Sequence, residues 1–134
     1  MHRSIVISRA IVLAGGVVQL VLGLLFWSGT AKALEPVHMA IGTIVVVSLI
    51  VLAAMALKAG APKPLGVLAI VWALVVLAVG ASQKGILTGS LHWVVQVIHL
   101  LLGIGAMGLA SIVAARVLPA KAKVDWAQPD PAER

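Results

Sequence analysis

The amino-acid sequence predicts an all-α membrane protein, built as a four-transmembrane-helix antiparallel bundle with cytoplasmic N- and C-termini. Of its 134 residues, 62% are hydrophobic and 10% are charged, whereas an ordinary soluble domain has about a quarter charged residues. The apolar residues form four long runs, and each run is long enough to cross a hydrocarbon core about 30 Å thick as a helix. Lys and Arg residues gather at one end of these runs, which sets the predicted orientation.

The four helices are expected at about residues 5–28, 36–58, 65–82 and 91–118. Together they make one transmembrane domain over residues 1–118, and residues 119–134 are expected to form a polar cytoplasmic tail. The first run ends in Trp27, whose amphipathic ring suits the membrane interface. Its basic start resembles a signal peptide. Its apolar stretch is longer than the usual 7 to 15 or so residues, so we interpret it as a retained helix.

The second run is predicted to begin as a helix at Pro36, because the first helical turn does not need the N–H that proline lacks. Glu35 precedes it at the positive end of the helix, and His38 lies on the same face. An Ala-Gly-Ala-Pro segment at 59–62 predicts the turn that follows. The third run, 65–82, contains no ionisable residue and is predicted to be scaffold.

The basic residues are unequally divided between the two ends of the predicted bundle. Eight of the ten Lys and Arg residues lie at the N-terminus, in the middle loop or at the C-terminus, and only Lys32 and Lys84 lie in the other two loops. The positive-inside rule therefore places both termini in the cytoplasm. We expect an integral protein of a bacterial or archaeal inner (cell) membrane, in contact with membrane lipid.

The composition excludes several functions. A net charge of +6 can indicate nucleic-acid binding, but basic residues at membrane ends first serve topology and anionic lipid, so no nucleic-acid partner is expected. Because there is no cysteine, disulfides, iron–sulfur clusters and thiolate metal sites are excluded. Gly103, Gly105 and Gly108 spell G-x-G-x-x-G, but without the strand–turn–helix setting of a nucleotide site.

Histidines stand inside two of the apolar runs, where an unpartnered imidazole costs about 1–3 kcal/mol. The second run reads His38-Met-Ala-Ile-Gly42 and the fourth reads His99-Leu-Leu-Leu-Gly103. Residues four apart share a helix face, so each histidine has bare backbone beside it. A flat macrocycle bonded through its metal to the imidazole needs that clearance. Two such histidines are the usual way for a helical bundle to hold haem iron from both sides.

The two histidines are expected at similar depths in the membrane. His38 precedes Lys58 by 20 residues and His99 precedes Arg116 by 17 residues, on helices that run in the same direction. At about 1.5 Å per residue the mismatch is about 4.5 Å, which helix tilt absorbs. His92 lies one heptad before His99 on the same face, so it is an alternative ligand or a supporting residue above the ring.

Other interpretations of these polar residues stay open. An intramembrane histidine, or Gln19 in the first run, can simply hydrogen-bond a neighbouring helix. Trp72 and Trp93 can flank a cofactor, although packing and interface anchoring are commoner roles. The protein could then be haem-free, as an accessory subunit of a larger membrane complex or as a small transporter. A transporter is disfavoured because Glu35 stands only at the entrance of a helix.

The chain resembles one half of haem A synthase, a membrane enzyme of two four-helix halves that each hold a haem between histidines on their second and fourth helices. The resemblance spans nearly the whole chain in layout. The matching pieces are Gln19-Leu-Val-Leu-Gly23, Glu35-Pro-Val-His38 in place of the family's ExxH, and Gln96-Val-Ile-His99-Leu-Leu-Leu. Met39 stands where the family often has Arg, the first outer loop is shorter, and the family's paired cysteines are absent.

The resemblance implies that His38 and His99 are the axial iron ligands of a haem b. It also implies that Glu35 is the outer-side carboxylate implicated in oxidising the porphyrin methyl group. We therefore expect a cytochrome b for electron transfer, or a haem-modifying oxidoreductase of the haem A synthase type. A homodimer or a larger respiratory membrane complex is the expected assembly. Four further residues are expected around the haem: Gln19, Gly42, Gln96 and Gly103.

Overall fold

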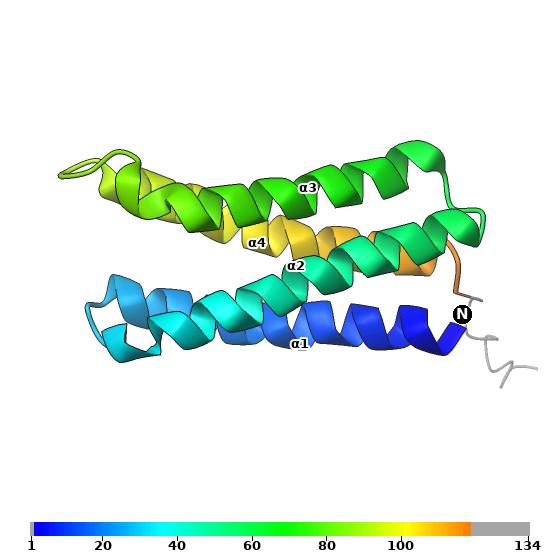
Figure 1. The fold of residues 1–134 in the computed structure, drawn as a ribbon, viewed down its shortest axis with the longest axis horizontal. Helices are drawn as coiled ribbons and strands as arrows, with labels where there is room; N and C mark the ends of the chain where they lie inside the picture. Colours follow the sequence, from blue (N-terminus) through cyan, green and yellow to red (C-terminus); the bar gives the residue numbers. More distant parts are fainter. Residues whose placement is uncertain (1, 119–134) are drawn as a thin grey trace, which may run out of the picture.

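The computed structural model describes residues 2–118, and this part of the chain is helical and contains no β-strand (Figure 1). Its four long helices are α1 (His2–Trp27), α2 (Glu35–Lys58), α3 (Lys63–Ser82) and α4 (His92–Ala115). All four are long and apolar enough to cross a membrane. For the described residues, the prediction of an all-α fold with four helices of membrane-spanning length is therefore confirmed. The predicted polar tail, residues 119–134, lies outside the described residues.

The helix ends differ from the predicted ends by a few residues. Helix α1 begins at His2 rather than at residue 5. Helix α3 begins at Lys63, because Pro64 fits its first turn instead of preceding it. Helix α4 ends at Ala115, after which the main-chain N–H of Leu118 turns back to the carbonyl of Ala114. Apolar periodicity marks the middle of a helix well and its terminal turns poorly.

Short connections fold the four helices into an antiparallel bundle. The 3-10 turn η1 (Lys32–Leu34) joins α1 to α2, and η2 (Gln83–Gly85) lies between α3 and α4. Around the bundle, α1 packs on α2 and α4, and α3 packs on the same two helices. Helices α2 and α4 are therefore diagonal partners, and they also contact each other. Side chains that point inward from α2 and α4 consequently face each other.

The two ends of the bundle are built differently. We call the end that holds the α2–α3 turn, the start of α1 and the end of α4 the closed end, and the opposite end the mouth (Figure 1). In the middle of the bundle and toward the closed end, the core consists largely of small residues. Leu49 and Leu52 are fully buried beside them. Small side chains let helices approach closely, which is how bundles pack within lipid. The fully buried alanines are Ala53, Ala56, Ala69, Ala73, Ala110 and Ala114.

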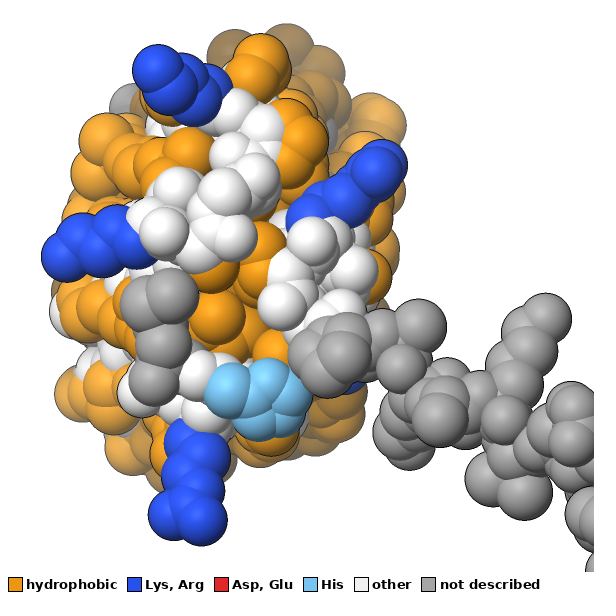
Figure 2. Space-filling model, turned by 90° about the vertical axis from the view of Figure 1, so that its right-hand side faces the viewer, with side chains coloured by type: hydrophobic (Ala, Val, Ile, Leu, Met, Phe, Trp, Pro, Cys, Tyr) orange, Lys and Arg blue, Asp and Glu red, His pale blue; other side chains and the backbone are white. Residues whose placement is uncertain are grey.

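The outer surface of the bundle is apolar. Large hydrophobic side chains are exposed on every helix, such as Val17, Ile44, Leu74 and Leu101, as expected for helices that face lipid. Figure 2 shows Lys and Arg side chains around the rim of the closed end. The concentration of basic residues at one end, noted in the sequence, is thus a property of one face of the folded molecule.

Candidate functional site

A cavity of about 470 Å³ lies between the helices in the mouth half of the bundle. This volume falls in the range of about 300–1,000 Å³ that is typical of ligand sites. All four helices contribute to its wall, and Leu49, Ala73 and Ala106 close it where the tightly packed core begins. The helices are therefore tightly packed toward the closed end and enclose the cavity toward the mouth.

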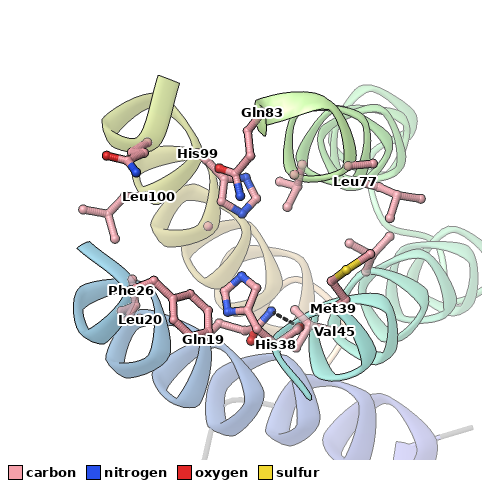
Figure 3. Close-up of a pocket in the computed structure, with 18 of the residues that line it drawn as sticks. Gln19, Leu20, Phe26, His38, Met39, Val45, Leu77, Gln83, His99 and Leu100 are labelled. Atoms are coloured by element: carbon pink, nitrogen blue, oxygen red, sulfur yellow. Dashed lines mark hydrogen bonds between the residues drawn. The ribbon is translucent and has the colours of Figure 1, made fainter. Parts of the chain in front are cut away.

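His38 of α2 and His99 of α4 point toward each other across this cavity (Figure 3). The centroids of the two imidazole rings are 6.4 Å apart, and the ring planes are inclined at 58°. The two histidines come from the diagonal pair of helices, at one level of the bundle. The sequence-based prediction that His38 and His99 lie at similar depths agrees with this short separation of their rings.

Both imidazole rings are positioned by packing. The ring of Phe26 meets the ring of His38 edge-on, with centroids 5.3 Å apart. Gly80 of α3 lies against His99, since a Cβ at position 80 would stand 2.8 Å from Cε1 of that ring. Within residues 2–118, Nδ1 of each histidine is buried without a hydrogen-bond partner. A buried unsatisfied polar atom costs about 1–3 kcal/mol, a cost that the residues described in this structure leave unmet at both rings.

Gln19 ties α1 to α2 beside His38. Its Nε2 donates a hydrogen bond of 2.9 Å to the main-chain carbonyl of His38, which confirms the interhelical bond left open for this residue. The amide lies over Gly42, where an added Cβ would stand 2.6 Å from Nε2. The space beside the backbone of Gly42 is therefore occupied by the side chain of Gln19. At Gly103, beside His99, no atom lies within 4 Å of the Cβ position, so the expected free space is present there.

Polar and charged residues surround the mouth of the cavity. Glu35, at the start of α2, forms an ion pair with Lys84 of η2. His92 lies at the start of α4, with its Nδ1 3.3 Å from the carbonyl oxygen of Ile86. Gln96 lines the wall between His92 and His99. Every residue predicted for the site lines this cavity: Gln19, Glu35, His38, Gly42, His92, Gln96, His99 and Gly103.

Neither Trp72 nor Trp93 lines the cavity, so the structure favours the packing and surface roles left open for them, and it gives the predicted scaffold helix a part in the site. Trp72 donates a hydrogen bond of 2.9 Å to the carbonyl of Leu102 and packs on Gly105, so it ties α3 to α4. Trp93 is 53% exposed on the outer surface. Helix α3 is more than scaffold, because its Gly80 makes room for His99. A glycine on another helix carries no local signal of the ring that it accommodates.

The two imidazoles do not form a complete metal site on their own. In the part of the chain that the structure describes, no three His, Cys, Asp or Glu side chains come together as a group that could hold a metal ion. Zinc sites of proteins use three or four side-chain ligands. A metal held by His38 and His99 would need further ligands, and haem iron has them in its porphyrin.

The spacing of the two rings fits such a metal. If one nitrogen of each ring pointed at the metal, two metal–nitrogen bonds of about 2.0 Å and two nitrogen-to-centroid distances of about 1.1 Å would place the ring centroids about 6 Å apart. The measured separation is 6.4 Å. The wall is formed mainly by apolar side chains and glycines, which suits the faces of a porphyrin. The residues present therefore fit a haem.

Comparisons of the chain with protein-family models, with curated proteins and with solved structures found no match. The geometry of the cavity and its two histidines is consequently the basis on which a function can be inferred for this protein.

Proposed function

We propose that the protein is a four-helix membrane cytochrome b that transfers electrons, with His38 and His99 as the axial ligands of a haem b iron. One observation carries this proposal: two half-buried imidazoles face each other, with ring centroids 6.4 Å apart, across a mainly apolar cavity. Bundles commonly hold cofactors between side chains of facing helices. The resemblance in layout to one half of haem A synthase supports the same ligand pair.

The haem would supply a one-electron couple, and the chain would bind and orient it. His38 and His99 each contribute one ring nitrogen, and Phe26 and Gly80 fix the orientation of the rings. If both histidines bound the iron, it would have no position free for a substrate. This arrangement suits electron transfer better than chemistry at the metal.

One chain offers one bis-histidine pair, which also favours electron transfer over haem modification. Of the four histidines, His92 lies at the mouth and His2 at the closed end. An enzyme of the haem A synthase type needs a cofactor haem and a substrate haem, and so would need two copies of this chain. That version predicts that haem O becomes haem A and that Glu35→Gln stops the conversion. Redox cycling without a modified haem supports the electron carrier.

The absorption spectrum tests the proposal. Protein purified from haem-replete cells is expected to show a Soret band, and His38→Ala and His99→Ala are each expected to lose it. Circular dichroism of the two variants checks that the helices still form. A folded, colourless wild-type protein contradicts haem binding, and its copurification with a large complex would instead indicate an accessory subunit.

We further propose a bacterial or archaeal inner (cell) membrane as the location, with the closed end in the cytoplasm. Of the described basic residues, five lie at the closed end and two, Lys32 and Lys84, at the mouth, as the positive-inside rule requires. Because this sequence contains no cysteine, single introduced cysteines report topology cleanly. A membrane-impermeant maleimide added to intact cells is expected to label Gly85→Cys and to spare Ala59→Cys. The reverse labelling contradicts the orientation.

A further inference from the structure

Three charged residues stand together at the mouth of the cavity. Within residues 2–118, Glu35 is the one acidic residue, and it lines the cavity beside Lys32 and Lys84. The five other described basic residues lie at the closed end, away from the cavity wall. The rim therefore has two ammonium groups and one carboxylate, above a mainly apolar interior.

The two lysines are available to a ligand. Lys84 pairs with Glu35, yet its side chain is 73% exposed and that of Glu35 is 40% exposed. Lys32 has no salt-bridge partner among the residues that the structure describes. An exposed ion pair contributes little stability, so an incoming anion can take Lys84 from Glu35 at small cost. The second ammonium group, on Lys32, needs no such exchange.

The cavity is thus amphipathic along the bundle axis. Its deep part is closed by Leu49, Ala73 and Ala106, and its rim has a net positive charge from Lys32, Lys84 and Glu35. A ligand that matches this gradient has a large apolar body and anionic groups along one edge. Protohaem has that shape, because its two carboxylates lie on one side of the macrocycle.

We propose that Lys32 and Lys84 bind the two carboxylates of the porphyrin, so that this edge of the haem faces the mouth, and that Glu35 competes with them for Lys84. This inference rests on the proposed haem site. It also predicts that neighbouring residues have opposite effects on the binding of the porphyrin. The lysines attract the porphyrin carboxylates, whereas the carboxylate of Glu35 repels them and occupies one of their partners.

Titration of the full-length protein with two porphyrins tests this assignment. Protein from haem-deficient cells, in lipid nanodiscs, is titrated with iron protoporphyrin IX and separately with its dimethyl ester, which lacks both negative charges. The Lys32→Gln/Lys84→Gln double variant is expected to bind the acid about fivefold more weakly or worse. Its affinity for the ester is expected to stay within about twofold of the wild-type value. The ester has no carboxylate, so the lysines cannot form an ion pair with it in either protein.

Two further variants sharpen the test. Glu35→Gln is expected to bind the acid more tightly than the wild type and the ester equally well. Lys58→Gln/Lys63→Gln removes the same charge at the closed end and is expected to leave both affinities unchanged. Retained ester binding shows that each variant is folded.

The possible failures separate the two proposals. Equal loss of acid and ester binding in the mouth variant, or no loss of either, overturns the role of the lysines. A weaker affinity of Glu35→Gln for the acid overturns the competition. If the wild-type protein binds neither porphyrin with a Soret band, the haem site itself is wrong.

Discussion

The side-chain amide of Gln19 donates a hydrogen bond of 2.9 Å to the main-chain carbonyl of His38, and it crosses the bare backbone of Gly42 to do so. One residue of α1 thereby holds the helical turn that carries one of the two facing imidazoles. The glycine of the His38-Met-Ala-Ile-Gly42 motif serves this contact. Its lack of a side chain is what lets the amide reach the carbonyl.

Substitutions at positions 19 and 42 are therefore expected to act through the same hydrogen bond. Gln19→Leu removes the donor, and Gly42→Ala pushes it away, because an added Cβ would lie 2.6 Å from Nε2. Each is expected to lower the stability of the haem-loaded protein by about 0.5–1.5 kcal/mol. Thermal unfolding of the single and double variants forms a double-mutant cycle. Fully additive losses would show that the two residues act independently.

Gly80→Ala is expected to disturb the site from a helix that carries no ligand. The added methyl group would stand 2.8 Å from Cε1 of His99, so the imidazole must rotate or withdraw. We expect haem affinity to fall about tenfold or more, since a ligand misplaced by a few tenths of an ångström loses bonding geometry. Electron paramagnetic resonance of the oxidised haem, which is sensitive to the orientation of the axial rings, measures the change.

Gly108→Ala is the matched control for that substitution. Gly108 is exposed on α4, and no atom lies within 4 Å of its Cβ position. Its variant is expected to keep the wild-type affinity and spectrum. If both alanine variants behave alike, the effect at position 80 is not due to contact with His99.

His92→Ala is expected to retain the Soret band. His92 lies at the rim, where its Nδ1 is 3.3 Å from the carbonyl of Ile86, while His38 and His99 face each other deeper in the cavity. The absorption spectrum of the variant, compared with that of His99→Ala, distinguishes a supporting residue from a ligand. Loss of the band in His92→Ala together with its survival in His99→Ala would exchange the two assignments.

Trp72→Phe is expected to weaken the bundle without moving the site. It removes the hydrogen bond to the carbonyl of Leu102 and part of the contact with Gly105. Together these changes should cost about 1–3 kcal/mol, seen as a lower midpoint of thermal unfolding in detergent. The Soret maximum is expected to stay in place, because Trp72 does not line the cavity. A shifted maximum would place this ring in contact with the haem.

The sequence was sufficient for the four helices and for the meeting of His38 with His99. Apolar runs of membrane-spanning length leave few alternatives for secondary structure. Counting residues from the charged helix ends then predicts depth, because the rise per residue is constant. The same residue spacing along α2 and α4 explains why Glu35, Gln96 and His92 line the same cavity.

Contacts between helices could not be predicted in this way. The ion pair of Glu35 with Lys84 and the fit of Gly80 to His99 depend on the rotation of α3 about its own axis. The apolar residues of α3 lie all around that helix, so its sequence does not indicate which face turns inward. Gln19 was recognisable as polar, but its acceptor was one of many carbonyls within possible reach.

Because the closed end is tightly packed, electrons would reach the proposed haem from one end of the bundle. His99 lies 7 residues after the start of α4 at the mouth and 16 residues before the end of that helix, or about 10 Å and about 24 Å along the axis. The tightly packed alanine layer would thus separate the proposed haem from one side of the membrane. Electrons would enter and leave through the mouth face, and a partner protein would have to dock there, over Lys32 and Lys84.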